Sequence, residues 1–419
     1  MTKRKRNGLL SKLGPGLVSG AADDDPSGIA THCQVGAQFG YGLSWTFALS
    51  FPLLAVIQFV AAEIGSVTGR GIAQNLRRHY PRPFLWIAVS LLLIANVINL
   101  GADLTAMGAV VQMFAGGKIW LYTLIFGLIC AGLEIFLPYR RYASVLKWTT
   151  LSLFAYVAVL IFAKVQWAEA LESLVVPRIE WSTAYATGFV AIMGTTISPY
   201  LFFWQAAQEV EEERRTHSKP LMVTPRQAGP EIERIRDDTL IGMAFSTLVS
   251  VAIVFASAAT LNRHGIDNVE SAAQAAEALR PIAGSLAAAL FAVGIIGTGM
   301  LAVPVLAGSA AYALSEMFGV TGSLSIKPTR ARFFNGVILV TTLAGASLSG
   351  FGINPIRALY WSAVVNGILA VPLMALMMLI VRNPKAMGKL TLSRAPSALG
   401  WAATAVMALA TVVFFASLL

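Results

Sequence analysis

Three consecutive aspartates followed by a proline stand near the start of the chain, in the stretch Ala22-Asp23-Asp24-Asp25-Pro26-Ser27-Gly28. The apolar segment around them, residues 13–39, is longer than the roughly 20 residues that cross a bilayer. A charge at membrane depth costs at least a few kcal/mol, so it is rarely kept for packing. Pro26 and the small residues after it favour a break in the helix, which exposes backbone carbonyls beside the carboxylates. We therefore expect a cation site at this break. The alternative is a helix that begins at Pro26 outside the membrane, with the aspartates as its cap.

The composition is that of a polytopic membrane protein. Of the 419 residues, 56% are hydrophobic and 12% are charged, against about 25% charged in soluble proteins. The net charge of +10 would also suit nucleic acid, but the basic residues are distributed as membrane topology requires, so no nucleic-acid partner is expected. Cys33 and Cys130 lie in apolar segments and form no disulfide or thiolate-metal pattern. The sequence has no ATP-binding, zinc-protease or dinucleotide motif, so we expect neither an enzyme nor a bound cofactor.

Eleven apolar segments have spanning length, and the basic residues orient them. With the N-terminus placed in the cytoplasm, 25 of the 31 Lys and Arg residues fall on the cytoplasmic side. This asymmetry predicts a cell-membrane protein with a cytoplasmic N-terminus, an odd number of spans and an external C-terminus. The expected spans are 14–38, 43–68, 84–112, 118–138, 142–164, 183–208, 238–261, 282–315, 331–349, 356–381 and 398–418.

Two polar connections stand out between these spans. Residues 209–237 predict a helix that continues out of the sixth span and then a solvated linker, a reading we prefer to a regulatory surface. Residues 265–280 predict a short amphipathic helix on the outer side, which packs on the bundle or covers an entry path.

A second helix break is expected in the sixth span. The stretch Gly194-Thr195-Thr196-Ile197-Ser198-Pro199-Tyr200 places a proline between hydroxyl residues in mid-membrane. Interrupted spans at matching positions of two halves point to a transporter site, whereas a lone proline is usually an ordinary kink. Spans one and six are five apart. Residues 14–164 and 183–381 would then form an inverted repeat within a single transporter domain, with 398–418 appended.

The same stretches resemble the NRAMP family of divalent-metal transporters, from about residue 10 to the last span. That resemblance implies an all-α integral membrane protein of the LeuT type, in the APC superfamily. It has about eleven transmembrane helices in a five-plus-five inverted repeat, with spans one and six broken. The motifs that carry it are Gly14-Pro15-Gly16, Asp25-Pro26-Ser27-Gly28, Gly36-Ala37-Gln38-Phe39-Gly40-Tyr41-Gly42, Thr68-Gly69-Arg70-Gly71 and Ala102-Asp103-Leu104-Thr105.

Departures from the family pattern concern the expected site. Gly28 stands where the family has an Asn ligand, and Ser198 where it has a Met. Tyr200 replaces a His, and Asp24 adds an acid before the motif. Losing the thioether removes the soft ligand that suits transition metals. These changes resemble the branch of NRAMP-related magnesium transporters; the aluminium transporters of grasses are a minor alternative.

Two further departures concern protons. Gln205 replaces the second His of the sixth span, and Ala106 replaces the Glu that follows Asp103 in the third. Neither Gln nor Tyr takes up a proton near neutral pH. We therefore expect transport that is not coupled to protons, with Asp103 as an acid near the site rather than a ligand.

The residues that remain form an oxygen-only ligand set. Hard oxygens suit Mg²⁺, Ca²⁺ and Mn²⁺, and the loss of Asn and Met enlarges the cavity, which suits a partly hydrated Mg²⁺. Two roles are open for Asn366: it binds the ion directly or through a water, or it forms an interhelical hydrogen bond, which is at least as common for such residues. We expect Asp23 at the rim and His32 as a packing residue with satisfied ring nitrogens. The metal-site residues expected are Asp25, Asp24, Gly28, Thr195, Ser198, Tyr200 and Asn366.

The function expected is uptake of Mg²⁺, and of Mn²⁺ as its mimic, by a carrier that acts as a monomer in the bilayer. One alternative is the proton-coupled Mn²⁺ or Fe²⁺ carrier of the parent family. Another is an amino-acid or organic-cation carrier on the same fold, which the cluster of acids disfavours. An ion channel is the third, disfavoured because paired broken helices are typical of carriers.

Overall fold

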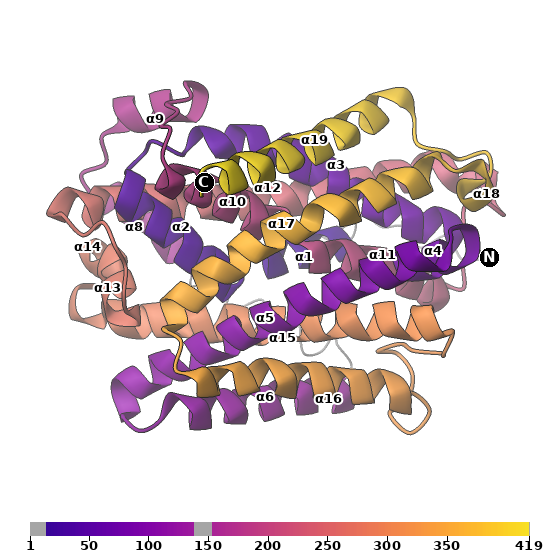
Figure 1. Ribbon diagram of the computed structural model, residues 1–419, viewed down its shortest axis with the longest axis horizontal. Coiled ribbons are helices and arrows are strands. Elements are labelled where there is room, and N and C mark those ends of the chain that lie inside the picture. Colours follow the sequence, from indigo (N-terminus) through magenta and orange to yellow (C-terminus); the bar gives the residue numbers. More distant parts are fainter. Residues whose placement is uncertain (1–13, 138–152, 419) are drawn as a thin grey trace, which may run out of the picture.

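The computed structural model describes residues 14–137 and 153–418, and every regular element in these ranges is a helix. Figure 1 shows long helices crossing the molecule, with the short α9, α13 and α14 at one end and α4 and α18 at the other. The helices are α1 (Pro15–Asp23), α2 (Pro26–Phe39), α3 (Trp45–Thr68), α4 (Ile72–His79), α5 (Arg82–Ala115), α6 (Ile119–Phe136), α8 (Phe154–Phe162), α9 (Trp167–Val175), α10 (Thr183–Thr196), α11 (Pro199–Thr216), α12 (Ala228–Thr260), α13 (Ala272–Ala276), α14 (Arg280–Ala283), α15 (Ala287–Phe318), α16 (Arg332–Ser347), α17 (Pro355–Arg382), α18 (Pro384–Met387) and α19 (Arg394–Ala416).

Nine helical stretches in the described ranges are long and apolar enough to cross a membrane. They match nine of the eleven expected spans. The first expected span is the pair α1 and α2, interrupted as predicted. Of the fifth, 142–164, the first part, 142–152, lies outside the described residues, and the second part contains α8.

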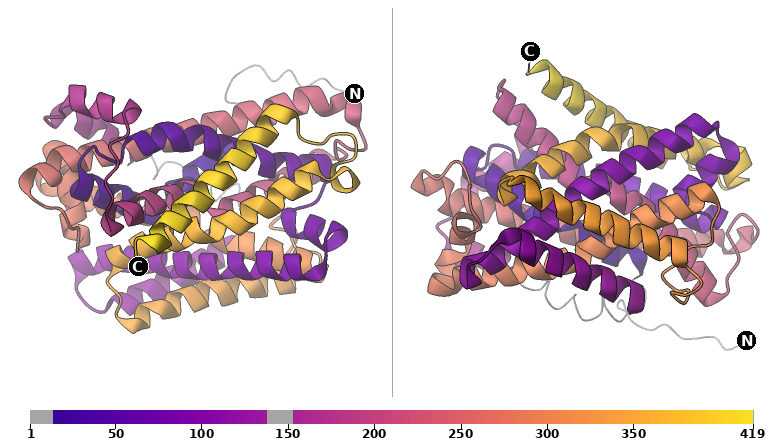
Figure 2. Two further views of the ribbon diagram at one scale, coloured as in Figure 1. Left: turned by 45° about the horizontal axis from the view of Figure 1, so that its top comes forward. Right: turned by 60° about the horizontal axis from the view of Figure 1, so that its bottom comes forward.

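Large apolar side chains cover the outside of the bundle. On α6, Trp120 is 49% exposed, Leu124 36% and Leu128 50%. Figure 2 brings forward α6 and α16, which lie side by side at one edge of the molecule. Apolar side chains in this quantity on an outer surface are typical of helices that face lipid.

Prolines fix both helix breaks. α1 ends at Asp23 and α2 begins at Pro26, with Asp25 as its N-cap. α10 ends at Thr196 and α11 begins at Pro199. Proline suits the first turn of a helix because its missing N–H is not needed there. Both predicted breaks are therefore confirmed in position.

Close backbone contact holds α1 against α12. A Cβ built on Gly20 would lie 2.2 Å from the carbonyl oxygen of Gly242, so only glycine fits there. At the start of α1, Asp238 of α12 accepts hydrogen bonds from the N–H groups of Gly14 and Gly16, both at 2.8 Å. These bonds satisfy donors that a helix start leaves without intrahelical partners.

The expected solvated linker at 209–237 is only partly correct. α11 does continue beyond the predicted span, to Thr216, and α12 begins at Ala228. However, Glu209 is 2% exposed and forms an ion pair of 3.0 Å with Arg234 of α12. The prediction of a solvated run is therefore wrong for Glu209, because this ion pair joins two packed helices.

The connection at 265–280, expected on the outer side, is helical but shorter than expected. It contains α13, a 3₁₀ turn at Glu277–Leu279 and the start of α14. Ala275 and Leu279 are buried, so one face packs on the bundle, which is one of the two roles that the sequence left open.

Candidate functional site

Asp25 lies at the centre of the first break and is 2% exposed. Its Oδ1 accepts a hydrogen bond of 2.6 Å from the N–H of Gly28, which caps α2. Its Oδ2 accepts a hydrogen bond of 2.9 Å from the side-chain amide of Asn99 on α5 and one of 3.3 Å from the hydroxyl of Tyr200. Asp25 is thus a buried carboxylate surrounded by neutral donors.

The two breaks meet at Tyr200 and Thr195. The hydroxyl of Tyr200 also lies 3.0 Å from the backbone carbonyl of Ala22, the last turn of α1. A Cβ on Gly28 would lie 3.2 Å from Oγ1 of Thr195 and 3.4 Å from Oδ1 of Asp25. Four of the expected site residues therefore gather around one point, where α1, α2, α10 and α11 end or begin.

Ser198 stands at the N-cap position of α11, but its side chain accepts no capping hydrogen bond. Its hydroxyl instead donates to the carbonyls of Gly194 and Thr195, at 3.0 and 2.9 Å, in the last turn of α10. The hydroxyl oxygen retains acceptor capacity, because a hydroxyl accepts as well as donates. Ser198 is 1% exposed and borders the second break.

Asn366 reaches the site through another residue. Its amide lies 3.5 Å from the side-chain oxygen of Asn99, which in turn bonds Asp25. The contact joins α17 to α5, so the interhelical hydrogen bond that the sequence left open is the role seen here.

Asp24 and Asp23 face α12 rather than Asp25. The hydroxyl of Ser246 lies 2.6 Å from Oδ2 of Asp23 and 3.4 Å from Oδ1 of Asp24. Asp23 is 5% exposed, so the expectation that it lies at the rim is wrong. The reason is that α1 continues through Asp23 and turns its side chain against the packed face of α12.

Several oxygens near the break have no protein partner within the described ranges. They are Oδ1 of Asp23, Oδ2 of Asp24, Oγ1 of Thr31 and Oγ1 of Thr196. Buried polar atoms are normally satisfied, so orphaned oxygens in one region point to a bound cation or water. In the described part of the chain, no three acidic, histidine or cysteine side chains converge. A cation here would accordingly be held by one or two carboxylates and neutral oxygens.

Asp103 lies fully buried on α5, close enough to Asp25 for their charges to interact, and faces the backbone N–H of Ser27. Neither of its carboxylate oxygens has a side-chain hydrogen-bond partner among the described residues. Gln205 takes a different direction: its carbonyl accepts from Ser19 at 2.5 Å and its amide donates to Glu209 at 3.2 Å. It links α11 to α1 through Ser19.

His32 is buried and packs its ring against Phe47, with ring centroids 5.4 Å apart. Its ring nitrogens make no hydrogen bond within the described ranges. The predicted packing is confirmed, but the prediction that the ring nitrogens would be satisfied is not.

Sequence reasoning missed Asn99 and Ser246. Both are polar residues within apolar spans, and Asn99 stands four residues, about one helical turn, before Asp103. Periodicity within the third span would have marked Asn99. Ser246 gave no comparable signal, because serine is common in membrane helices.

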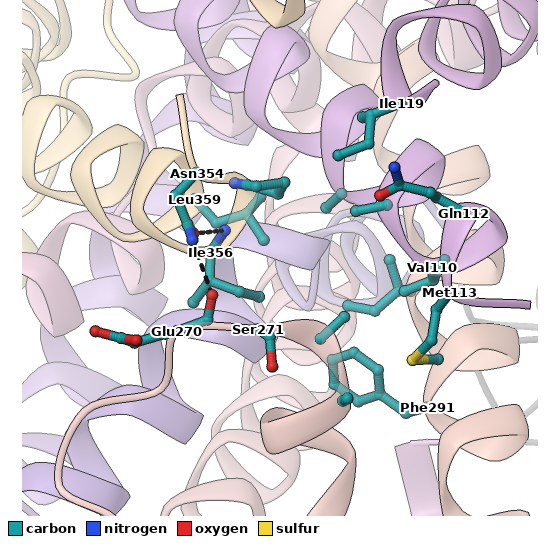
Figure 3. Close-up of a pocket in the computed structure, with 16 residues that line it drawn as sticks. Val110, Gln112, Met113, Ile119, Glu270, Ser271, Phe291, Asn354, Ile356 and Leu359 are labelled. Carbon is teal, nitrogen blue, oxygen red and sulfur yellow. Dashed lines mark hydrogen bonds between the residues drawn. The ribbon is translucent and has the colours of Figure 1, made fainter. Parts of the chain in front are cut away.

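A cavity of about 280 Å³ opens between α5, α13, α15 and α17 (Figure 3). Asn354 borders it and fixes the adjoining loop, accepting from the N–H of Ile356 at 2.9 Å and donating to the carbonyl of Glu270 at 2.8 Å. The cavity reaches Ala106 and Leu359. The carbonyl of Leu359 also accepts a hydrogen bond of 3.3 Å from the hydroxyl of Ser27, which follows the first break. Leu359 therefore connects the wall of the cavity to the site. The aspartates themselves do not line the cavity.

Known proteins resemble this chain over most of its length. A family profile described as "Natural resistance-associated macrophage protein-like" (Nramp) matches residues 16–417. A divalent metal cation transporter MntH of Klebsiella pneumoniae subsp. pneumoniae is 26% identical over 416 residues, which is 97% of this chain and 94% of the relative. An MntH of Yersinia pestis is 28% identical over 303 residues, covering 70% of this chain and 69% of the relative.

Solved structures show the same fold. A crystal structure of the Eremococcus coleocola manganese transporter superposes with a TM-score of 0.76 at 16% identity, covering 98% of this chain and 88% of that one. Mhp1, a nucleobase-cation-symport-1 family transporter, superposes with a TM-score of 0.56 at 14% identity, covering 97% of this chain and 92% of that one. These likenesses confirm the predicted fold class. Since the profile covers nearly the whole sequence, the chain belongs to the Nramp family.

Proposed function

We propose that this protein is a carrier that moves Mg²⁺, and Mn²⁺ as its mimic, into the cell through the break between α1 and α2. The observation that carries the proposal is Asp25: a buried carboxylate at a helix break, in contact with Tyr200, Asn99 and the N–H of Gly28. The neighbouring orphaned oxygen of Asp24 supplies a further hard ligand. Transport of a divalent metal ion is also what the names of the MntH relatives state for those proteins.

The preference for Mg²⁺ rests on the ligand chemistry and on space. Serine and tyrosine occupy the positions where a thioether and an imidazole would favour softer ions. Gly28 keeps side-chain atoms out of the site, because even a Cβ there would lie 3.2 Å from Oγ1 of Thr195 and 3.4 Å from Oδ1 of Asp25. A site with few direct protein ligands suits an ion that keeps several of its waters, as Mg²⁺ does.

Uptake without protons is the second part of the proposal. Gln205 bonds to Ser19 and Glu209 and has no titratable proton to exchange near neutral pH. The membrane potential alone supplies about 4.6 kcal/mol for a divalent ion at 100 mV. This corresponds to roughly a thousandfold accumulation, so proton coupling is not required.

A proton-coupled manganese carrier is the competing function, favoured by the burial of Asp103 beside Asp25. The structural neighbour from Eremococcus coleocola is named as a manganese transporter. In that case Asp103 would carry the proton.

One experiment separates the two functions. The purified chain is reconstituted in liposomes, and Mg²⁺, Mn²⁺ and Ca²⁺ fluxes are recorded at a clamped potential with a pH-sensitive dye inside. We expect Mg²⁺ and Mn²⁺ to enter without acidification. Acidification that rises with the metal dose would overturn the uncoupled mechanism, and uptake of Mn²⁺ without Mg²⁺ would overturn the assigned substrate.

We further propose that the protein works as a monomer in the cell membrane, with α4 and α18 toward the cytoplasm and the end of α19 outside. The distribution of Lys and Arg supports this orientation. Labelling of single cysteines placed at the two ends, in intact cells, would test it.

A further inference from the structure

A second and larger cavity, of about 850 Å³, lies away from the aspartates. Its floor is one face of α3, from Phe51 to Glu63, and its walls are the start of α12 and the loop that leads from α18 into α19. Twelve residues of helix separate Phe51 from Glu63, which is roughly 18 Å at 1.5 Å per residue. The cavity is thus a groove about as long as an extended acyl chain of moderate length.

Most of the groove is apolar and borders the lipid-facing surface. Pro52, Val56 and Phe59 line it from α3, and Leu240 and Leu399 line it from α12 and α19. Leu240 and Leu399 are each 40% exposed. In a chain that spans a membrane, an apolar groove at this surface is open to the hydrocarbon of the bilayer.

One end of the groove is charged. Glu63 lines the groove there and is only 5% exposed, and its Oε2 has no hydrogen-bond partner in the described ranges. A buried carboxylate without a partner is costly, so it points to a donor that the protein itself does not provide. Lys389 and Arg236 border the same groove.

The two cations differ in availability. Arg236 already pairs with Asp237 at 3.1 Å and with Glu233 at 3.8 Å. Lys389 is exposed and takes part in no ion pair within the described ranges. At this end of the groove, the buried carboxylate of Glu63 therefore lacks a hydrogen-bond donor, and the ammonium of Lys389 lacks an anion.

We propose that this groove binds an aminophospholipid of the cytoplasmic leaflet. The primary ammonium of an ethanolamine headgroup donates to Glu63, the phosphate pairs with Lys389, and one acyl chain lies along Pro52, Val56 and Leu399. A zwitterionic headgroup with N–H donors satisfies both charges. An anionic headgroup without an amine, such as glycerol phosphate, offers Glu63 neutral hydroxyl donors but no cation, and the quaternary ammonium of choline has no N–H to donate.

The test uses the full chain purified in detergent, with phosphatidylethanolamine, phosphatidylcholine and phosphatidylglycerol of identical acyl chains. Native mass spectrometry counts the bound lipid, and thermal unfolding measures its stabilising effect. We expect one phosphatidylethanolamine to be retained with about tenfold higher affinity than phosphatidylcholine, the loss that follows removal of one hydrogen bond to a charged group.

Variants assign the preference to the groove. Glu63→Gln keeps the side-chain shape and should bring phosphatidylethanolamine down to the level of phosphatidylcholine, and Lys389→Met should weaken all phospholipids. The controls are Glu180→Gln and Lys385→Met, exposed charges that do not line the groove. The unfolding temperature without lipid shows whether each variant is folded.

Two outcomes would overturn the proposal. One is equal binding of the three lipids by the unmodified chain. The other is a folded Glu63→Gln variant that keeps its preference for phosphatidylethanolamine. Neither outcome bears on ion transport, so failure here is distinguishable from failure of the proposed carrier function.

Discussion

Tyr200 and Asp25 join the two broken helices: the tyrosine hydroxyl lies 3.3 Å from Oδ2 of the aspartate, although 175 positions separate the residues. The same hydroxyl reaches the last turn of α1 at the carbonyl of Ala22. An ion that binds Asp25 must therefore compete with the Tyr200 hydroxyl or use its oxygen. This contact places a residue of α11 directly beside the expected metal ligand.

Asp25→Asn should reduce Mg²⁺ flux in liposomes to the level of empty vesicles. The amide keeps the size of the side chain but removes the charge that attracts a divalent ion. Asp24→Asn should lower flux by about tenfold, an effect typical of a supporting residue. Asp237→Asn, an exposed acid at the start of α12, is the matched control and should leave flux unchanged. Unaltered flux in Asp25→Asn would remove the break from the transport path.

Gly28→Ala should weaken Mg²⁺ transport without unfolding the protein. The added Cβ would lie 3.2 Å from Oγ1 of Thr195, a contact that narrows the site and requires a small shift. Gly28→Asn with Ser198→Met should move the preference toward Cd²⁺, because it adds a soft ligand and removes space for water. Gly132→Ala, which meets nothing within 4 Å, serves as the control. An unchanged Mg²⁺-to-Cd²⁺ ratio in the double variant would refute the explanation from cavity size.

Asp103→Asn tests the proton question at one residue. If transport is uncoupled, metal uptake in this variant should occur without acidification, as in the unmodified chain. Ala106→Glu adds a carboxylate one turn from Asp103, and the pH trace should stay flat in this variant too. Acidification in Ala106→Glu would show that two acids together form a proton relay. A pH signal present in the unmodified chain and lost in Asp103→Asn would identify Asp103 as the proton carrier.

Gly20→Ala should destabilise the protein by about 1–3 kcal/mol, as overpacking of a close contact usually does. Its Cβ would meet the carbonyl of Gly242 at 2.2 Å, so α1 must move away from α12. Gly336→Ala on α16 meets nothing within 4 Å and should be neutral or slightly stabilising, since alanine favours helix. Denaturation in detergent measures both. Equal stability of Gly20→Ala and the unmodified chain would contradict the close packing of α1 on α12.

Ala109→Cys should react with a charged thiol reagent applied from outside, and the modification should lower metal flux. Ala109 lines the cavity that ends beside Ser27, so a bulky cation attached there blocks the approach to the site. The two native cysteines are buried, which keeps the background low. Glu180→Cys, on an exposed connection, should react without loss of flux. Full flux in the modified Ala109→Cys variant would show that ions take another route.

The helices and both breaks could be predicted because their signals are local. Hydrophobic length marks the spans, and Pro26 and Pro199 mark the starts of α2 and α11. The network around the site could be predicted only in part, because it depends on which faces of distant helices meet. Asn99 and Ser246 contact the aspartates from α5 and α12, and no local pattern states that they do. Glu209 likewise belongs to a run of charged residues, which predicts exposure to solvent. The sequence does not show that Arg234 of α12 lies beside it and forms an ion pair.

The attachment of α1 to α12 has a consequence for biosynthesis. Asp238 follows Gly14 by 224 positions and Gly16 by 222, and Ser246 follows Asp23 by 223. The ribosome therefore releases the first helix long before the residues that fix it exist. Until then, Asp23 and Asp24 would lack their Ser246 partner in lipid, at a cost of at least about 2.5 kcal/mol each. The N-terminal helix must accordingly take its final position late, after more than half of the chain has been synthesised.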